Sequence, residues 1–428
     1  MPPSSSSSDY DAVIVGASLA GCTTAMLLAR SGVRVALVEQ RPDMNAFKRV
    51  CGHFIQSSAV PTLERTGLLE PIERAGGVRS RIRIWTRWGW IEPPAESIVP
   101  ASVNLRREKL DPLVRRAAAE TPGVELIFGT TVDRVLFDGG FAAGVEGRGS
   151  TGRRSVLRGK LVVGADGRDS RVAELARLPP GFSPHGRFSY AGYFEGPAPV
   201  GAPNGSMWML DPQWAAAFPT DSELIMYACM PTHDRLPEFR RDPARALCSL
   251  IADLPDAPPI RASRMVAPVI GKLRMPNVRR GPLGAGLALV GDAALSADPL
   301  FGVGCGWAFQ SAEWLAGATA AALRGEESLR VALSRYRKLF GRGLLAHNWT
   351  LGDYATGRRM NIPERLLFSA AAYDERVATR FEAFGTRNID PRRFLPTIVP
   401  SVIAAHARHR LGGIATRSPE APNPQPSA

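Results

Sequence analysis

The sequence predicts an α/β protein in which two separated parts of the chain form one nucleotide-binding domain. Residues 10–21 run from a short apolar strand through a glycine turn into a helix, and residues 287–292 end a second apolar strand that leads into a glycine-rich helix start. Between them, residues 181–275 carry proline, aromatic and β-branched residues in short runs, a pattern typical of an antiparallel sheet. The sequence therefore predicts an inserted sheet, with further helices after residue 325.

The same patterns predict six segments. Residues 1–9 are serine-rich and residues 412–428 are rich in proline and serine, so we expect both to be disordered tails. Residues 10–180 form the first part of the nucleotide-binding domain, including a small β-meander, and residues 276–325 form its second part. Residues 181–275 form the substrate-binding sheet domain between them. Residues 326–411 form a C-terminal helical region.

Composition excludes several classes of protein. The 428 residues are 45% apolar and 22% charged, which is ordinary for a globular protein. The net charge of +13 comes nearly all from arginine residues scattered along the chain, and this scatter favours a solvated surface over an anion-steering role. Nucleic acid is not expected as a partner, because no recognised nucleic-acid-binding module accompanies the positive charge. No apolar run is long enough to span a membrane, and five cysteines without metal-ligand spacing indicate a cytoplasmic protein.

The first glycine turn fits a dinucleotide. Gly16 permits a tight turn after the strand, and Gly21 lets the next helix pack closely on the sheet, so that helix N–H groups face a pyrophosphate. Ser18 replaces the usual middle glycine. Glu39 ends the second strand 23 residues after Gly16, where a carboxylate can accept hydrogen bonds from ribose hydroxyls. Dinucleotide binding is therefore preferred over an ordinary βαβ turn.

The second segment suits the far half of the same long cofactor. Asp292 supplies a carboxylate at the end of a strand, and Pro299, Gly302 and Gly304 lead into a second helix. Together the two segments indicate a flavin rather than a nicotinamide dehydrogenase.

Three motifs in order resemble the fingerprints of FAD-dependent group A flavoprotein monooxygenases. They are the glycine turn with Glu39, residues 163–170 with Asp166, and residues 290–294 with Asp292. These enzymes share the para-hydroxybenzoate hydroxylase fold with geranylgeranyl-reductase-like enzymes and flavin halogenases. The resemblance implies a Rossmann-like FAD-binding domain with an inserted antiparallel β-sheet substrate domain and a C-terminal helical region. It covers roughly residues 10–325 and is specific for fold and cofactor more than for reaction.

The resemblance also implies which residues bind FAD. The pyrophosphate, the ribose, the ribityl chain and the isoalloxazine ring would each have their own group of contacts. Those residues are Gly16, Ala17, Ser18, Gly21, Glu39, Arg107, Val132, Asp166, Asp292, Pro299, Gly302, Gly304 and Cys305. Arg106 competes with Arg107 for the role of the arginine near the cofactor. Asp166 could instead cap the helix that starts near Ser170.

One departure concerns the third motif, where Leu295 stands in place of the usual histidine. A role that depends on that side chain is therefore in doubt. No residue can be assigned as a catalytic base. His53, which follows Cys51-Gly52, is the best candidate among the six histidines.

The resemblance implies a monooxygenase that uses a flavin C4a-hydroperoxide to oxygenate a small organic substrate, in secondary metabolism, with NAD(P)H as electron donor. A partner reductase that supplies reduced flavin is the alternative, since no second dinucleotide motif is present. The alternative functions are a carbon–carbon double-bond reductase like the geranylgeranyl reductases, a flavin halogenase and an inactive flavin-binding paralogue. Aromatic residues of the inserted sheet are candidate pocket walls, although an ordinary core position is favoured for each of them. They are Tyr193, Trp208, Trp214, Phe218 and Tyr227.

Overall fold

The computed structural model describes residues 9–94 and 96–415, so the predicted tails lie outside it apart from Asp9 and residues 412–415. Its first sheet joins the two separated parts of the chain in the order β20-β21-β11-β1-β2-β8. The strands are β1 (Tyr10–Val15), β2 (Val35–Val38), β8 (Val124–Ile127), β11 (Arg154–Gly164), β20 (Leu283–Gly284) and β21 (Leu287–Leu289). β1 pairs in parallel with β2 and β11, and β21 pairs in parallel with β11. This confirms the predicted α/β fold class.

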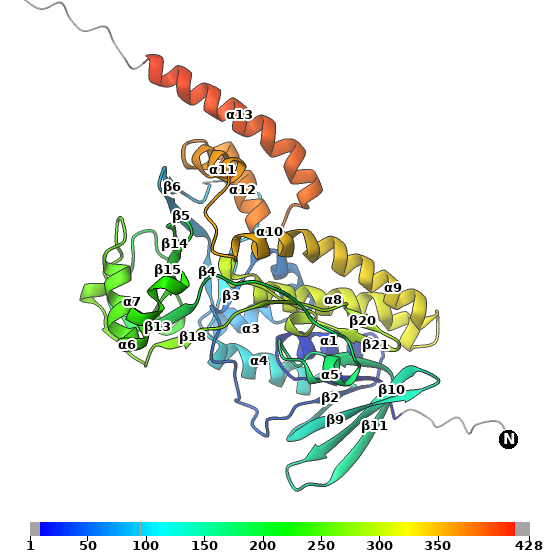
Figure 1. Cartoon of the computed structure of the whole chain (residues 1–428). Helices are drawn as coiled ribbons and strands as arrows, with labels where there is room; N and C mark the ends of the chain where they lie inside the picture. Colours follow the sequence, from blue (N-terminus) through cyan, green and yellow to red (C-terminus); the bar gives the residue numbers. More distant parts are fainter. Residues whose placement is uncertain (1–8, 95, 416–428) are drawn as a thin grey trace, which may run out of the picture.

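Helices cover this sheet. α1 (Leu19–Arg30) follows β1 and packs against α8 (Val303–Leu323) and α4 (Arg107–Ala119). Strand residues 12–14 and 35–38 are fully buried, as expected for a parallel sheet covered by helices. The predicted meander consists of β9 (Thr130–Asp138), β10 (Phe141–Gly149) and residues 154–158 of β11, which extend from the same sheet as the projecting arm in Figure 1.

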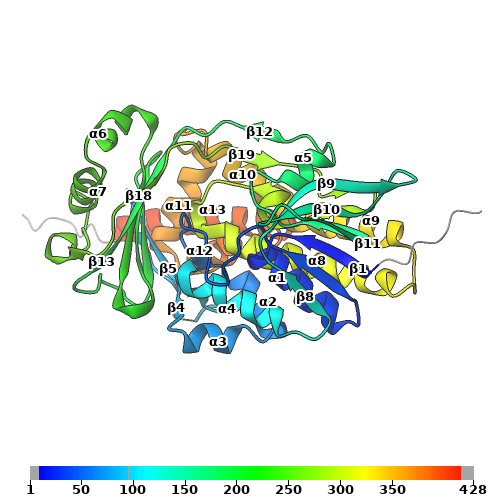
Figure 2. The ribbon, with the colours of Figure 1, turned by 90° about the horizontal axis from the view of Figure 1, so that it is seen from below.

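A second, largely antiparallel sheet has the order β17-β13-β16-β15-β14-β5-β6 with β18 on β13, and Figure 2 shows it beside the first domain. Its strands are β5 (Ile82–Thr86), β6 (Gly89–Ile91), β13 (Ser189–Glu195), β14 (Gly205–Met209), β15 (Trp214–Pro219), β16 (Ile225–Met230), β17 (Arg264–Met265) and β18 (Ile270–Lys272). β5 pairs in parallel with β14. The sheet therefore extends beyond residues 181–275, because β5 and β6 come from earlier in the chain.

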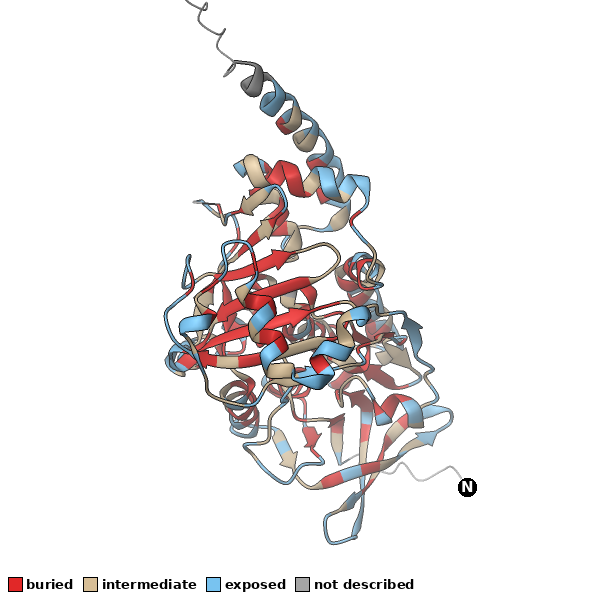
Figure 3. Ribbon diagram, turned by 60° about the vertical axis from the view of Figure 1, so that its left-hand side comes forward, coloured by how far each residue is buried: buried red, intermediate tan, exposed pale blue. Residues whose placement is uncertain are grey.

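The two faces of the second sheet belong to different hydrophobic cores. Figure 3 colours the ribbon by burial and shows buried residues along the strands. Successive residues of a strand point to opposite faces. Met207, Ala216 and Ala228 join the large core shared with the first sheet and its helices, whereas Trp208 and Tyr227 face α6 (Leu236–Arg241) and α7 (Pro243–Ala252). One face is thus directed toward the nucleotide-binding domain and the other is closed by its own helices.

The remaining helices and small sheets connect these two layers. α2 (Val60–Arg65) and α3 (Leu69–Arg74) lie between β2 and β5 in the chain, and α5 (Arg171–Leu175) follows β11. The small sheets are β3 (Phe54–Ile55), β4 (Val78–Ser80) and β7 (Ser102–Asn104), and β12 (Gly181–Ser183), β19 (Asn277–Arg279) and β22 (Leu295–Ser296). The C-terminal region contains α9 (Leu329–Phe340), α10 (Ala346–Tyr354), α11 (Ile362–Tyr373), α12 (Glu375–Gly385) and α13 (Pro391–Ala415).

Candidate functional site

The glycine turn after β1 is closed too tightly for any side chain. Gly16 has φ +104°, and a Cβ there would lie 2.6 Å from the carbonyl oxygen of Ala165. A Cβ on Gly21 would lie 1.9 Å from the carbonyl oxygen of Gly16. Both positions therefore require glycine, and the start of α1 is held directly over the turn, as a pyrophosphate-binding loop needs.

Glu39 and Arg107 both reach this loop. Glu39 is buried, and its Oε2 accepts a 2.8 Å hydrogen bond from the backbone N–H of Ala17. Arg107 donates from Nη2 to the Oγ of Ser18 at 2.9 Å. Arg106, the competing arginine, instead pairs with Asp221 near the second sheet at 2.9 Å. The geometry thus separates the two neighbouring arginines and favours Arg107 as the cofactor-side residue.

Sequence reasoning missed Arg115 as part of this loop. Its buried guanidinium donates from Nε to the carbonyl oxygen of Ala17 at 2.9 Å and also reaches the carbonyl oxygens of Met44 and Ala46. Arg115 therefore ties the turn to the segment that follows β2. Its place on α4, two turns after Arg107, is the only sequence signal that could have indicated it.

Asp292 forms an ion pair that sequence reasoning also missed. Its Oδ2 lies 2.8 Å from the Nζ of Lys48, 244 positions earlier in the chain. Burial raises the pKa of Asp292, but the charge and hydrogen bond of Lys48 outweigh burial and hold it below its usual range. A carboxylate kept ionised in this way can accept hydrogen bonds from ribityl hydroxyls, and Lys48 adds a cation beside them.

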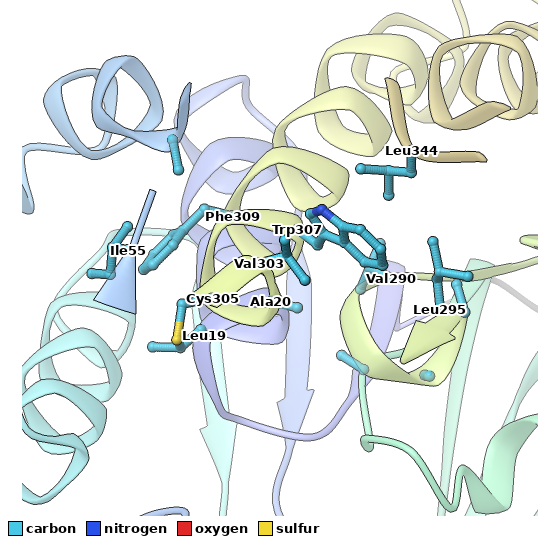
Figure 4. Close-up of a cluster of buried hydrophobic side chains, with 14 of the residues drawn as sticks. Leu19, Ala20, Ile55, Val290, Leu295, Val303, Cys305, Trp307, Phe309 and Leu344 are labelled. Atoms are coloured by element: carbon cyan, nitrogen blue, oxygen red, sulfur yellow. The ribbon is translucent and has the colours of Figure 1, made fainter. Parts of the chain in front are cut away.

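The start of α8 offers open backbone at the expected ring position. Pro299 precedes the turn η6 (Leu300–Gly302), and Gly302 has φ +64° with a would-be Cβ 2.8 Å from the Phe54 ring. A Cβ on Gly304 would meet no atom within 4 Å. Because α8 is 21 residues long, its first N–H groups and dipole can stabilise negative charge placed in that open space. Figure 4 shows this start of α8 against Leu19 and Ala20 of α1.

A buried ionic group fixes the turn before α8. Asp298 accepts hydrogen bonds from Arg187 Nη2 and His185 Nε2, each at 2.8 Å, and its Oδ1 accepts one from the N–H of Leu300 at 2.7 Å. Arg187 and Asp298 are both fully buried. The loop that would face the flavin ring is therefore anchored to the chain leading into the second sheet.

Two cysteine thiols meet beside Gly304. The Sγ atoms of Cys51 and Cys305 are 3.7 Å apart, and Arg107 donates to Cys51 Sγ at 3.5 Å. The hydrogen bond from Cys305 lowers the pKa of Cys51; burial opposes this, and the charges of Arg107 and Lys48 add to the lowering. The thiol of Cys305 thus contacts Cys51, whereas the sequence predicts a role for the Cys305 backbone rather than for its thiol.

The contacts of Asp166 favour its structural role. Its oxygens accept hydrogen bonds from Ser170 Oγ at 2.6 Å and from the N–H of Val172 at 2.9 Å, at the start of α5. Val132 lies on β9, two residues after Thr130, whose N–H donates to the carbonyl oxygen of Glu39 at 3.0 Å. Val132 is therefore on the same side of the molecule as the predicted ribose site, while Asp166 caps a helix.

His53 and Tyr193 form a pair between the two domains. The hydroxyl of Tyr193 lies 2.5 Å from His53 Nε2, and their rings stack at 5.5 Å. His53 is only 2% exposed, and its Nδ1 has no hydrogen-bond partner among the described residues. Burial lowers the pKa of His53 to about 4, so its imidazole is neutral at pH 7. This nitrogen is therefore a buried polar atom that the described residues leave unsatisfied.

The five aromatic residues predicted as pocket walls lie on opposite faces of the second sheet, three on one face and two on the other. Tyr193, Trp214 and Phe218 face the large core and the FAD-side domain. Trp208 and Tyr227 point to the opposite face and pack on α7, because their strand positions alternate with the inward ones.

An apolar cavity lies on the inward side of the second sheet. It is lined by Phe54 of β3 and the following Gln56, by sheet residues Ile84 and Ile91, and by Phe381 of α12. A Cβ on Gly302 would lie 2.8 Å from the Phe54 ring, so Phe54 lies next to both this cavity and the loop before α8. The C-terminal region, through α12, therefore forms one wall of the cavity.

The residues present fit FAD at both ends. The turn at Gly16 leaves backbone exposed to an anion, and Glu39 lies next to it. The start of α8 adds the empty space at Gly304 and the ionised Asp292. Phosphate-binding backbone, hydroxyl acceptors and a helix N-terminus are the groups that a flavin dinucleotide requires.

Comparison with known proteins decides the family. A family model described as FAD binding domain matches residues 9–344. The chain belongs to this FAD binding domain family. FAD is therefore the cofactor of the family, and the predicted relationship to group A flavoproteins is confirmed.

Individual relatives carry different activities. The chain is 32% identical to 6-methylpretetramide 4-monooxygenase of Streptomyces rimosus over 184 residues, which is 41% of this chain and 43% of that protein. It is 27% identical to digeranylgeranylglycerophospholipid reductase 2 of Methanopyrus kandleri (strain AV19) over 329 residues, 69% of this chain and 73% of that protein. The alignment thus spans less than half of the monooxygenase.

A solved structure shows the same fold. The myxobacterial chondrochloren halogenase superposes with a TM-score of 0.71 at 21% identity, covering 90% of this chain and 98% of that one. Within residues 9–94 and 96–415, no three acidic, histidine or cysteine side chains are grouped to hold a metal ion. No helix among the described residues is long and apolar enough to cross a bilayer.

Proposed function

We propose that this protein is an FAD-dependent monooxygenase that oxygenates a small organic substrate, with NAD(P)H as electron donor. The observation that carries the proposal is the position of the Tyr193–His53 pair, which joins the inward face of the second sheet to the cofactor segment beside Cys51. The name of the Streptomyces relative supports the monooxygenase activity. A role in secondary metabolism belongs to the same proposal.

The cofactor would be held along the path already described. Gly16, Ala17, Ser18 and Gly21 would bind the pyrophosphate, Glu39 the ribose and Asp292 the ribityl chain. Arg107 would support the phosphate loop through Ser18. Pro299, Gly302, Gly304 and Cys305 would contact the ring. FAD, once reduced, supplies the electrons with which dioxygen is split between substrate and water.

The chain's own residues do the remaining work. The apolar inward face of the second sheet keeps water away from the reacting atoms, with Trp214 and Phe218 among its buried residues. We assign His53 Nε2 as the acceptor from the Tyr193 hydroxyl, so the ring proton lies on Nδ1. The pair can then hold or pass a proton at a substrate oxygen.

The function is tested with FAD-loaded protein, NADPH and a panel of phenolic and other aromatic compounds under labelled dioxygen. We expect at least one compound to accelerate NADPH oxidation and to gain one labelled oxygen atom. Oxidation of NADPH that yields only peroxide with every compound contradicts the proposal for that substrate class. Product formation under nitrogen would contradict oxygenation altogether.

Tyr193→Phe is expected to lower kcat by about 10²-fold while FAD affinity stays unchanged, because a positioned proton-transfer group contributes about that much. The matched control is Tyr227→Phe on the other face of the same sheet, which should leave kcat unchanged. A Tyr193→Phe enzyme with wild-type kcat would remove the pair from the mechanism.

The pH profile of kcat tests His53 separately. Because the neutral imidazole is the acceptor and burial lowers its pKa, activity should fall only as pH approaches about 4 rather than near 6.5. His53→Gln should abolish that acid limb as well as lower kcat. A limb near 6.5 in the wild-type enzyme would mean that His53 is not held in this buried pair.

A double-bond reductase is the second candidate. The thiol of Cys51 beside Gly304, with its lowered pKa, and the Methanopyrus relative both favour it. FAD-loaded protein reduced with dithionite would then saturate an isoprenoid double bond without dioxygen. The anaerobic arm of the test above distinguishes the two functions.

A further inference from the structure

The last helix, α13, is apolar on more than the side that it buries. Residues 394–405 contain no charged side chain. One side packs on α11 and α12, where Phe394, Ile398 and Ala405 are at most 4% exposed. Phe394 also stacks on Phe384 at 4.1 Å. This side explains how α13 is attached to the body, but it accounts for only part of the helix.

The outer side of α13 carries a stripe of exposed apolar residues. Leu395, Val399 and Ile403 follow one another at intervals of four and are 59%, 53% and 64% exposed. Neighbouring α11 adds Ile362 and Leu366, exposed at 71% and 45%. Figures 1 and 3 show α13 projecting from the body with exposed residues along it. A contiguous row of exposed apolar side chains marks a surface that binds a partner or a membrane.

The charged side chains of α13 itself are all arginines. Residues 391–410 contain four arginines and no acidic residue. Arg392 and Arg393 stand before the stripe and Arg410 after it, while Arg408 pairs with Asp374. The whole chain, these arginines included, has a net charge of +13. An anionic partner therefore complements both ends of the stripe.

This charge pattern argues against a second copy of the chain. Whether two α13 helices met in parallel or antiparallel orientation, arginines at the ends would face arginines. The polar side chains near the stripe also offer little to a protein partner. Thr397 and Ser401 donate their hydroxyls to helix carbonyl oxygens, at 3.0 Å and 2.9 Å. Apolar side chains flanked by arginine suit a lipid surface instead.

We propose that the α13 stripe, Leu395, Val399 and Ile403 with the flanking arginines, binds the surface of an anionic lipid bilayer. The helix lies along the interface, where its apolar side chains enter the boundary of the acyl chains and its arginines meet lipid phosphates. The proposal does not depend on the reaction that the FAD site performs. It assigns the end of the C-terminal region to membrane association.

The test is sedimentation of the full-length protein with vesicles of phosphatidylcholine alone or mixed with phosphatidylglycerol. We expect binding to the mixed vesicles, little binding to phosphatidylcholine, and release by high salt. Val399→Glu should weaken binding by about tenfold or more, because it places a charge in the apolar stripe. Val331→Glu on α9 is the matched control, since Val331 is 55% exposed against 53% for Val399, and it should bind like the wild type.

Thermal melts of both variants check that each retains its fold. Failure of the wild type to bind phosphatidylglycerol vesicles overturns the proposal, as does equal binding by Val399→Glu. A dimer in light scattering that Val399→Glu alone abolishes, without vesicle binding, would assign the stripe to a second copy instead. Binding that is lost in Val399→Glu and kept in Val331→Glu supports the proposal.

Discussion

Gly21→Ala is expected to weaken FAD binding by more than about 100-fold and to lower the melting temperature. The new Cβ would stand 1.9 Å from the carbonyl oxygen of Gly16, an atom of the rigid turn rather than the end of a flexible side chain. Either α1 must move away from the turn or the turn must open, and both remove backbone donors from the pyrophosphate. Flavin fluorescence titration and a thermal melt measure the two effects.

Gly317→Ala is the matched control for this prediction. Gly317 is also a helical glycine, in α8, but a Cβ there would meet no atom within 4 Å. Because alanine favours a helix over glycine by about 1 kcal/mol, this variant should bind FAD normally and melt no lower than the wild type. Wild-type FAD affinity in Gly21→Ala would mean that the turn does not bind the cofactor.

Arg187→Ala is expected to destabilise the protein by about 3–5 kcal/mol, because it leaves a buried carboxylate without its cation. The lost hydrogen bond joins Arg187 Nη2 to Asp298 Oδ2 at 2.8 Å, and both side chains are fully buried. Since Asp298 also holds the N–H of Leu300, FAD affinity should fall as well. Urea denaturation and FAD titration test both parts.

The matched control is Arg235→Ala, which removes an exposed pair with Glu238 and should cost less than about 1 kcal/mol. The pH dependence gives a further check. Burial raises the pKa of Asp298, but His185 and Arg187 outweigh it and lower the folded value. Its stabilising contribution is therefore complete above the unfolded value of about 3.9 and is lost as pH falls through the folded value. An Arg187→Ala effect no larger than that of Arg235→Ala would show that the pair is not a structural anchor.

The cofactor loops could be predicted because their requirements are local. Gly16 and Gly21 are defined by a strand, a turn and a helix that follow one another in sequence. In the structure Gly16 has φ +104°, and a Cβ on Gly21 would lie 1.9 Å from the carbonyl oxygen of Gly16. The same holds for Gly302, whose φ of +64° ends a turn before a long helix. Strand alternation would also have separated Trp208 from Trp214, had the register of β14 and β15 been known.

The side-chain pairs that complete the site could not be predicted. Lys48 and Asp292 are 244 positions apart, and His53 and Tyr193 are 140 apart. Such pairs depend on how segments far apart in the sequence pack together, which no local period encodes. The pairing of β5 with β14 is of the same kind, since it brings residues 82–86 into a sheet whose other strands, apart from β6, lie within residues 189–272.

The most direct measurement is titration of the purified full-length chain with FAD and, separately, with FMN. FAD bridges the turn at Glu39 and the start of α8, whereas FMN lacks the adenosine half. We therefore expect one FAD per chain, FMN binding at least about tenfold weaker, and loss of most of that difference in Gly21→Ala. A chain that takes up no FAD, or that binds FMN equally well, would contradict a single dinucleotide site extending between the two glycine-rich segments.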